Sequence, residues 1–316
     1  MRLDDTEQSD NIEDRRGDSG GGGGFGLPMG GGGLGIGAIV VLGLIGWALG
    51  IDPRLLIGGA EVLSGGGSQV QRPMQPTGGQ ARRTGAPSDD IGKFVSTVLG
   101  NIEVEWVDIF RQDGQTYRKP VLVLYQGRTG AACGGQNGAQ AAMGPFYCPN
   151  DEKIYLDTSF FREIETRFQG CEVGSKSCQF SQAYVIAHEV GHHVQKLLNI
   201  LAKVQQQQQS MDRAAANHLQ VEVELQADCL AGVWANHENT RLQKAGKPAL
   251  VEPGDIEAAL RTASAIGDDT LQRKASGRVV PDSFTHGTSE QRQRWFTNGY
   301  REGTVAACNT FRAANL

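Results

Sequence analysis

The hydrophobic positions of the chain include one long unbroken run. Residues 34–51, LGIGAIVVLGLIGWALGI, are apolar throughout and are followed by Asp52 and Pro53. As a helix that rises 1.5 Å per residue, this run would be about 27 Å long, close to the hydrocarbon thickness of a bilayer. A buried core helix is the alternative, but the polar segments on both sides disfavour it. The pattern predicts a transmembrane helix over residues 34–51.

The segments on either side of this run have too few hydrophobic positions to build a core. Residues 1–33 join a charged stretch, MRLDDTEQSDNIEDRR, to a glycine-rich one, and we expect a disordered N-terminal tail. Residues 52–88, which include SGGGSQVQRPMQPTGGQARRTGAPSDD, have the composition of a flexible linker. The folded domain is therefore predicted to span residues 89–316, which is long enough for a packed core.

Within residues 89–316, helical periodicity predominates over strand alternation. A helix is predicted over residues 90–112, and the chain from Ser181 onward is expected to be mainly helical. Two short strands are predicted, at residues 119–127, KPVLVLYQG, and residues 153–161, KIYLDTSFF. The predicted fold class is α+β, a mainly helical domain with a small sheet.

One predicted helix carries polar residues on an otherwise apolar stretch, AYVIAHEVGHHVQ, residues 183–195. His188 and His192 are four residues apart and share a helix face, so their imidazoles can bind one metal ion. Glu189 lies about 100° further round, where it can act on a water without being a ligand. The pattern predicts a zinc site, and the alternative is histidines that bond other side chains. His193 points away and is not an expected ligand.

A catalytic zinc ion needs a third protein ligand and an open position for water. The segment LQVEVELQADCLAGVWANH, residues 219–237, places Glu224 and Asp228 on one helical face. We expect Glu224 to be the ligand and Asp228 to accept the N–H of a ligand histidine. Glu222 is expected to pair with His218 instead. The alternative for Glu224 is an ordinary solvated glutamate.

A further polar group lies in PDSFTHGTSEQRQRWFTNGY, residues 281–300. His286 is predicted to lie in a loop before a helix whose N-cap is Ser289. A loop histidine ahead of Arg292 can stabilise the oxyanion that forms when a carbonyl is attacked. The alternative for His286 is a packing or capping role.

Charge and cysteine content narrow the possible classes. The net charge is −5, and the basic residues are scattered, so nucleic acid is not an expected partner. Six cysteines without a CxxC pair favour disulfides in an oxidising compartment over a structural zinc cage, with free buried thiols as the alternative. These candidates are Cys133, Cys148, Cys171, Cys178, Cys229 and Cys308.

The expected membrane topology follows from the flanks of residues 34–51. The region before this run is long and acidic, which favours an uncleaved signal anchor over a cleaved signal peptide. Basic residues occur on both flanks and do not decide the orientation. The cysteines favour a C-terminal domain outside the cytoplasm. We therefore expect a single-pass protein attached to the lipid bilayer through one N-terminal helix.

These motifs together resemble the bacterial putative neutral zinc metallopeptidase family of single-span membrane proteins. The resemblance covers nearly the whole chain, including SDNIEDRR, GPFYCP, YVIAHEVGHHVQKLL, ELQADCLAGVW and GRVVPDSFTHGTSEQRQRWF. It implies a zincin-like domain of the gluzincin type on the periplasmic side of the bacterial inner membrane. By position it implies one Zn²⁺ bound by His188, His192 and Glu224, with Glu189 as the general base and Asp228 behind the ligands.

The same resemblance extends to the C-terminal motif and the cysteines. The motif around His286 and Arg292 is similar to an HPSxxxR element of other gluzincins, with Gly287 in place of proline. The resemblance implies that Cys133, Cys148, Cys229 and Cys308 belong to the family pattern, while Cys171 and Cys178 look like an insertion in this chain. The pairs that this implies are Cys171 with Cys178, Cys133 with Cys148, and Cys229 with Cys308, and the sequence alone does not establish them.

The resulting hypothesis is a membrane-anchored zinc-dependent endopeptidase, in which a zinc-activated water attacks a peptide bond and Glu189 carries the proton. A protein or peptide substrate is expected, and KIYLD is a candidate strand edge for pairing with it. Two alternatives remain. One is a non-hydrolytic membrane adaptor with a structural zinc site, which would not need a base at Glu189; the other is a zinc hydrolase acting on non-peptide bonds.

Overall fold

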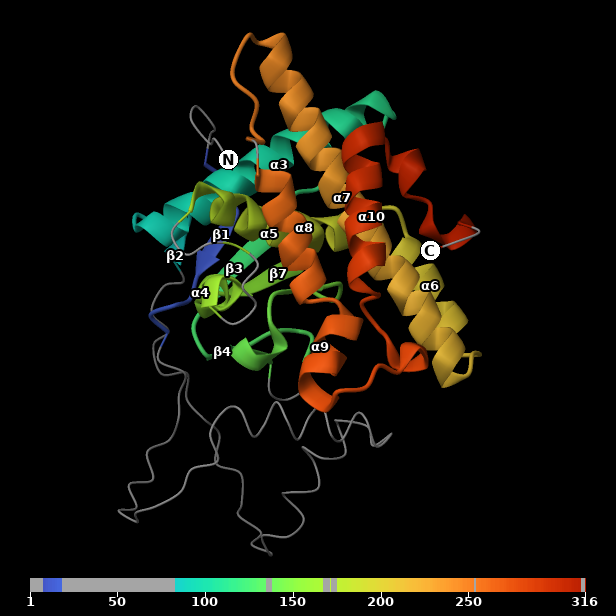
Figure 1. Cartoon of the computed structure of the whole chain (residues 1–316). Helices are drawn as coiled ribbons and strands as arrows, with labels where there is room; N and C mark the ends of the chain where they lie inside the picture. The colour runs from blue at the N-terminus through green and yellow to red at the C-terminus, as the bar shows by residue number, and fades with distance from the viewer. Residues whose placement is uncertain are drawn as a thin grey trace, which may run out of the picture. The chain divides into compact units, whose positions relative to one another are not determined.

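Helices account for most of the domain, and a small sheet lies to one side of them (Figure 1). The computed structural model describes residues 8–18, 83–134, 138–166, 171, 175–252, 254–313 and 316. The predicted α+β class is confirmed at this level. The transmembrane helix predicted over residues 34–51 lies outside the described residues. Among the helices that are described, none is both long enough and apolar enough to cross a bilayer.

The main sheet has five strands in the order β2-β1-β3-β7-β6. β1, β3 and β7 are parallel, whereas β2 and β6 are antiparallel to their neighbours. The strands are β1 Ile12–Asp14, β2 Arg83–Thr84, β3 Val121–Tyr125, β6 Phe146–Cys148 and β7 Lys153–Asp157. A separate two-stranded sheet joins β4 Arg128–Thr129 to β5 Ala139–Gln140.

The disordered-tail prediction is wrong for residues 8–18, because these residues contribute strand β1. Ile12 pairs with Leu122 in parallel register and is 1% exposed. The linker predicted over residues 52–88 also contributes structure, since β2, Arg83–Thr84, pairs with β1. The charged composition suggested that ordering would be too costly. Instead, one buried isoleucine and several polar bonds to the domain offset the entropy of this short segment.

The strand predicted over residues 153–161 is confirmed for KIYLD, residues 153–157, but residues 159–161 begin helix α4, Ser159–Thr166, instead. The predicted position of this strand at a sheet edge is wrong. β7 pairs with β3 on one side and with β6 on the other, so its backbone is already bonded. The outer strand is β6, Phe146–Cys148, which precedes β7 and pairs with it through a tight turn. Three residues are too few to show strand alternation, so no periodicity predicts this strand.

α3 and the helices after Ser181 fall where helical periodicity predicts them, whereas α4, Ser159–Thr166, was not predicted. α3 begins at Asp90 because the Asp89 side chain accepts a hydrogen bond from Gly92 N. For α10 the predicted N-cap is wrong: Thr288 caps the helix in a capping box with Gln291, and Ser289 is already helical. The helices are α3 Asp90–Gln112, α4 Ser159–Thr166, α5 Lys176–Leu197, α6 Ile200–Gln208, α7 Arg213–Lys244, α8 Asp255–Ala265, α9 Asp268–Ser276 and α10 Ser289–Glu302.

Side chains on the two faces of the main sheet belong to two different hydrophobic clusters. Alternate residues of β3 and β7 pack with α3 and α5 in the main core, namely Leu122, Leu124, Ile154 and Leu156. The residues between them, including Val123 and Tyr155, form a smaller cluster with the segment that follows β3. The sheet therefore supports α5 on one face.

Close backbone approach joins α7 to α10. A Cβ atom on Gly299 would lie 1.9 Å from the Cys229 carbonyl oxygen, and one on Gly232 would lie 2.2 Å from the Phe296 carbonyl oxygen. Only glycine fits at such contacts. The Cys229–Cys308 disulfide lies at the same junction. The other two implied pairs, Cys133–Cys148 and Cys171–Cys178, are also formed.

We predict that Gly299→Ala lowers the free energy of unfolding by about 2 kcal/mol, because the methyl group overlaps backbone that must move. This cost exceeds the gain of about 1 kcal/mol that alanine normally brings to a helix. Urea unfolding measures the change. Gly130→Ala is the control, since a Cβ atom there meets nothing within 4 Å. Equal stability of the two variants would contradict the close approach.

Candidate metal centre

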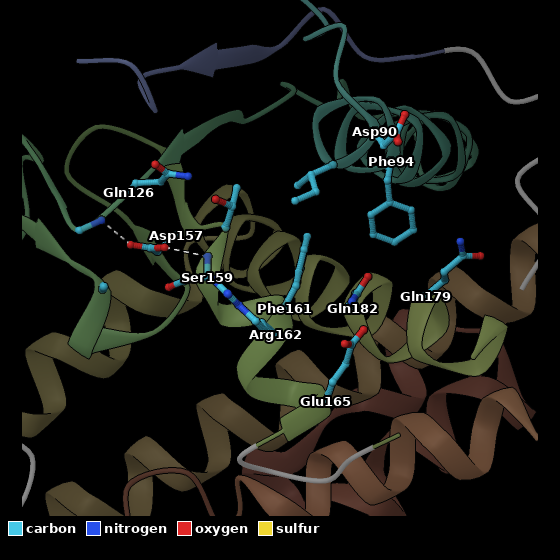
Figure 2. A pocket seen from close by; sticks show the side chains of 14 residues that line it. Asp90, Phe94, Gln126, Asp157, Ser159, Phe161, Arg162, Glu165, Gln179 and Gln182 are labelled. Carbon is cyan, nitrogen blue, oxygen red and sulfur yellow. Dashed lines mark hydrogen bonds between the residues drawn. The ribbon is translucent and has the colours of Figure 1, made fainter. Parts of the chain in front are cut away.

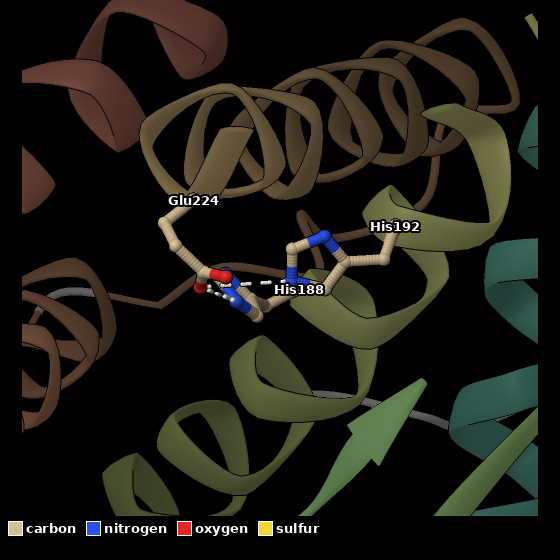
Figure 3. A group of neighbouring side chains, drawn as sticks. All are labelled: His188, His192 and Glu224. Carbon is tan, nitrogen blue, oxygen red and sulfur yellow. Dashed lines mark hydrogen bonds and ion pairs between the residues drawn. The ribbon is translucent and has the colours of Figure 1, made fainter. Parts of the chain in front are cut away.

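The site forms where α5 crosses α7. A Cβ atom on Gly191 would lie 2.9 Å from the carbonyl oxygen and 3.1 Å from the Cα atom of Ala227, so the two helices are in backbone contact there. Gly191 lies inside the HEVGH stretch, between the two histidines on one helix, and Ala227 lies between Glu224 and Asp228 on the other. The crossing therefore brings the two motifs together (Figure 3).

Three potential ligands converge at this crossing. The structure brings together His188, His192 and Glu224, with one ligand atom from each lying within 4.8 Å of the others. Glu224 Oε2 is 3.3 Å from His188 Nε2 and 3.6 Å from His192 Nε2. Ligands at about 2.0–2.1 Å from a tetrahedral zinc ion are about 3.3–3.5 Å apart. The two distances to Glu224 and the donor set therefore fit Zn²⁺.

His188 is held by a buried ionic network. Its Nδ1 donates to Asp228 Oδ1 at 2.8 Å, which leaves Nε2 facing Glu224. The same carboxylate accepts from Tyr184 Oη at 2.5 Å and from Arg292 Nε at 2.8 Å. Asp228 is fully buried, and Arg292 is only 3% exposed. Arg292 thus balances the charge of Asp228, and Asp228 lies between Arg292 and His188 in this hydrogen-bond network.

His192 is held by an amide. Its Nδ1 lies 2.9 Å from Gln195 Oε1, and Gln195 Nε2 donates to Val223 O at 2.8 Å and to Gln226 Oε1 at 3.0 Å. Because the amide nitrogen is used by these acceptors, the amide oxygen faces His192, whose Nδ1 is then the donor. Gln226 in turn donates to Cys308 O at 2.9 Å. Nε2 of His192 is left facing Glu224.

The pKa shifts show that this group attracts positive charge. Burial lowers the pKa of His188, but Asp228 and then Glu224 raise it more, to about 10. Burial raises the pKa of Glu224, but the two imidazoles lower it well below its usual value. A buried carboxylate of this kind needs either a proton on an imidazole or a metal ion. Metal binding would release that proton.

Glu189 lies on α5 between the two histidines and is 7% exposed. It is not part of the converging three-residue group. The pKa of His192 is raised: burial lowers it, whereas Glu224 and also Glu189 raise it. Glu189 is therefore close enough to influence the histidine electrostatically without being placed as a ligand.

His286 lies in the loop before α10, and Asp268 fixes that loop. Asp268 Oδ2 accepts from the backbone N–H groups of Thr285, His286 and Gly287 at 2.7, 2.6 and 3.1 Å. His286 Nδ1 lies 3.3 Å from Asp268 Oδ1, and its side chain is 52% exposed. Burial lowers the pKa of His286, but Asp268 and Glu224 raise it more. The negative charge of Glu224, the proposed ligand, therefore favours the protonated form of the His286 imidazole.

Two residues that were not expected as ligands have other contacts. His193 Nε2 donates to Arg118 O at 2.6 Å, and its Nδ1 lies 3.0 Å from Tyr147 Oη. Glu222 lies 3.6 Å from His218 at the surface of α7. Neither belongs to the converging group.

Sequence reasoning missed Tyr184, Gln195, Gln226 and Asp268, although each contacts a candidate site residue. Tyr184 and Gln195 do carry a weak signal. They lie four residues before His188 and three after His192, spacings at which helical side chains can meet. Gln226 and Asp268 act across separate segments, and no spacing in the sequence relates them to the site.

A second hollow is separate from this centre. A cavity of about 750 Å³ lies among the first turn of α3, the end of β7, α4 and the start of α5 (Figure 2). The Asp157 carboxylate at its wall accepts from Gly127 N and Ser159 N. None of the residues that line the cavity belongs to the three-residue group.

Fold and site define a mainly helical α+β protein with a potential metal centre of two histidines and one carboxylate. The chain belongs to the putative neutral zinc metallopeptidase family, whose model matches residues 1–311. It is 44% identical to the uncharacterized protein YpfJ of Escherichia coli K12 over 315 residues, 98% of this chain and 99% of that protein. It is 41% identical to the uncharacterized protein Rv2575 of Mycobacterium tuberculosis over 238 residues, 74% and 75% of the two chains. No solved structure gives a significant match.

We predict that Gln195→Leu weakens zinc binding by roughly 10- to 100-fold, because His192 loses the acceptor that orients its ring. Competition with a fluorescent chelator at fixed pH measures the affinity. Gln206→Leu on the exposed face of α6 is the matched control and should bind zinc as the unchanged chain does. Equal affinities in all three proteins would show that the amide does not position His192.

Proposed function

We propose that the protein is a zinc-dependent endopeptidase that hydrolyses peptide bonds in a protein or peptide substrate. One observation carries the proposal: both histidine Nε2 atoms face the same Glu224 oxygen, at 3.3 and 3.6 Å. Three protein ligands are the number typical of a catalytic zinc ion, which keeps one position for water. Membership of a family described as zinc metallopeptidases supports the same reaction.

Glu189 and Asp228 have separate roles in the proposed reaction. When bound, a zinc ion would polarise the substrate carbonyl and lower the pKa of a water, so that the water could lose a proton and attack the carbonyl carbon. Glu189 accepts the proton of the attacking water and passes it to the leaving amine. Asp228 keeps the Nδ1 proton on His188, so that Nε2 stays available as a ligand.

His286 is the proposed oxyanion donor. Its Nδ1 faces Asp268, which favours a protonated imidazole and leaves Nε2 for the substrate. A positively charged donor stabilises the negative oxygen that develops during attack on a carbonyl. Arg292 is fully engaged with Asp228 and Tyr184, so we assign it to the support of His188.

We place an extended substrate along β6, Phe146–Cys148. Its outer side has no partner strand among the described strands, so it can pair with a peptide backbone. Tyr147 on this strand contacts His193, the neighbour of His192 on α5. β6 therefore runs beside the helix that carries the proposed catalytic residues.

We further propose attachment to the bacterial inner membrane through residues 34–51, with the domain in the oxidising periplasm. The length and apolarity of that run support the attachment. Three disulfides support the compartment, because such bonds rarely persist in a reducing cytoplasm.

We predict that Glu189→Gln retains zinc and loses cleavage of an unfolded casein-like substrate by at least 100-fold, since proton transfer of this kind contributes about 10²- to 10⁴-fold. Metal content and peptide release are measured on the same samples. Glu222→Gln on the neighbouring helix is the matched control and should remain active. Undiminished cleavage by the Glu189 variant would contradict the mechanism. Zinc binding without cleavage in the unchanged chain would favour a structural adaptor.

A further inference from the structure

Strand β1 precedes the apolar run in the sequence, whereas almost all of its partners follow that run. The N-terminal residues through Asp18 and the chain from Arg82 onward form one compact unit. β1 lies between β2 and β3 in the sheet, so both of its edges are paired. The segment that lies between them in the sequence, residues 19–81, contains the apolar residues 34–51.

The contacts of β1 are those of an integral part of the domain. Ser9 Oγ and Asn11 Nδ2 donate to the same Glu103 carboxylate oxygen, at 3.0 and 2.8 Å. Arg15 is 8% exposed and donates to Gly130 O at 2.8 Å. Glu103 is itself 1% exposed, so removal of the strand would strip a buried carboxylate of two donors.

β3 also depends on β1. Leu122 and Leu124, which pair with Ile12 and Asp14, are fully buried. Without β1, the backbone of this apolar strand would become an unpaired outer edge of the sheet, and β2 would lose the strand with which it pairs. The fold described above therefore requires β1 to be in the same compartment as residues 83–316.

The residues on the two sides of the intervening segment 19–81 lie next to each other in the domain. Asp14 pairs with Arg83 across the β1–β2 contact, and Arg16 forms an ion pair with Asp89. A chain that crosses the bilayer once through residues 34–51 would place these partners on opposite sides of about 30 Å of hydrocarbon. Residues 52–81 offer no second apolar run for a return crossing and contain Asp52, Arg54, Glu61 and Arg72.

We infer that β1 and the metallopeptidase domain occupy the same side of the membrane, so that residues 34–51 do not act as a single-pass anchor in the folded protein. The inference rests on the proposed membrane attachment and not on the proposed peptidase activity. Hydropathy leads us to expect a single-pass topology. In the topology inferred instead, the chain before residues 34–51 and the chain after them are both on the side of the membrane that holds the domain.

This topology also relates the attachment to the strand order of the sheet. The chain enters and leaves the attachment at the β2–β1 edge, whereas β6, beside the metal-site helix, is the opposite edge of the sheet. Four steps of about 4.8 Å separate the outer strands, or about 19 Å. The proposed substrate strand is therefore the outer strand opposite β2, at the far end of the sheet from the strands that flank the membrane segment in the sequence.

The test joins residues on the two sides of the apolar run. Glu13 and Thr84 are direct partners in the antiparallel β1–β2 pair, a spacing suited to a disulfide. The variant is the full chain with Glu13→Cys and Thr84→Cys and a site-specific protease site placed in the SGGGS stretch, residues 64–68. It is expressed in bacteria, thiols are blocked, and isolated membranes are cleaved.

On a non-reducing gel we expect the N-terminal fragment to stay joined to the domain in most molecules and to separate after reduction. The two single-cysteine variants should release it without reductant. Release of the fragment from the double variant without reductant would overturn the inference.

A second measurement does not depend on forming that disulfide. Single cysteines at the exposed positions Asp10 and Lys203 are treated with a membrane-impermeant maleimide in intact and permeabilised spheroplasts. We expect both to be labelled under the same conditions. Labelling of only one of them in intact spheroplasts would place β1 and the domain on opposite sides and overturn the inference. Neither readout requires zinc or cleavage, so the result is separate from that of the Glu189→Gln test.

Discussion

The site depends on one close contact between two helices. Gly191 on α5 and Ala227 on α7 let the backbones touch, and only at that separation do imidazoles from one helix and a carboxylate from the other share a metal-sized space. The HExxH spacing supplies two ligands from one helix, but the third must come from a separate element. Glycines at 232 and 299 then fix α7 against α10, so the same backbone contacts that stabilise the domain also position Glu224.

Charge explains why this crossing is not simply an apolar core. Asp228 and Arg292 form an ion pair that is buried from solvent. Asp228 also accepts a hydrogen bond from His188 and so holds its ring in one orientation. His192 is oriented by a neutral amide instead, so the two histidines have different electrostatic surroundings. Burial raises the pKa of Glu224, but the two imidazoles beside it lower that pKa more, so Glu224 keeps its negative charge although it is buried. Buried ionisable groups with shifted pKa values are typical of functional sites.

The sequence predicted the parts of this structure that depend on local spacing, such as the bounds of α3 and the presence, though not the bounds, of the two motif helices. It also indicated Glu224 and Asp228, because residues four apart on a helix must share a face. It did not indicate β1, since three residues in a charged segment become a strand only through long-range pairing with β3. The same limitation explains the misplaced edge at β7 and the missed roles of Gln226 and Asp268, whose partners are distant in sequence.

The central claim is that one ion is bound by His188, His192 and Glu224. X-ray absorption at the zinc edge of the purified full-length protein, combined with its metal content, tests this most directly. The account predicts one tightly bound zinc ion per chain, surrounded by two imidazole nitrogens and oxygen atoms at about 2.0–2.2 Å and by no sulfur. A protein that holds no transition metal, or one whose zinc is coordinated by sulfur, would contradict the account.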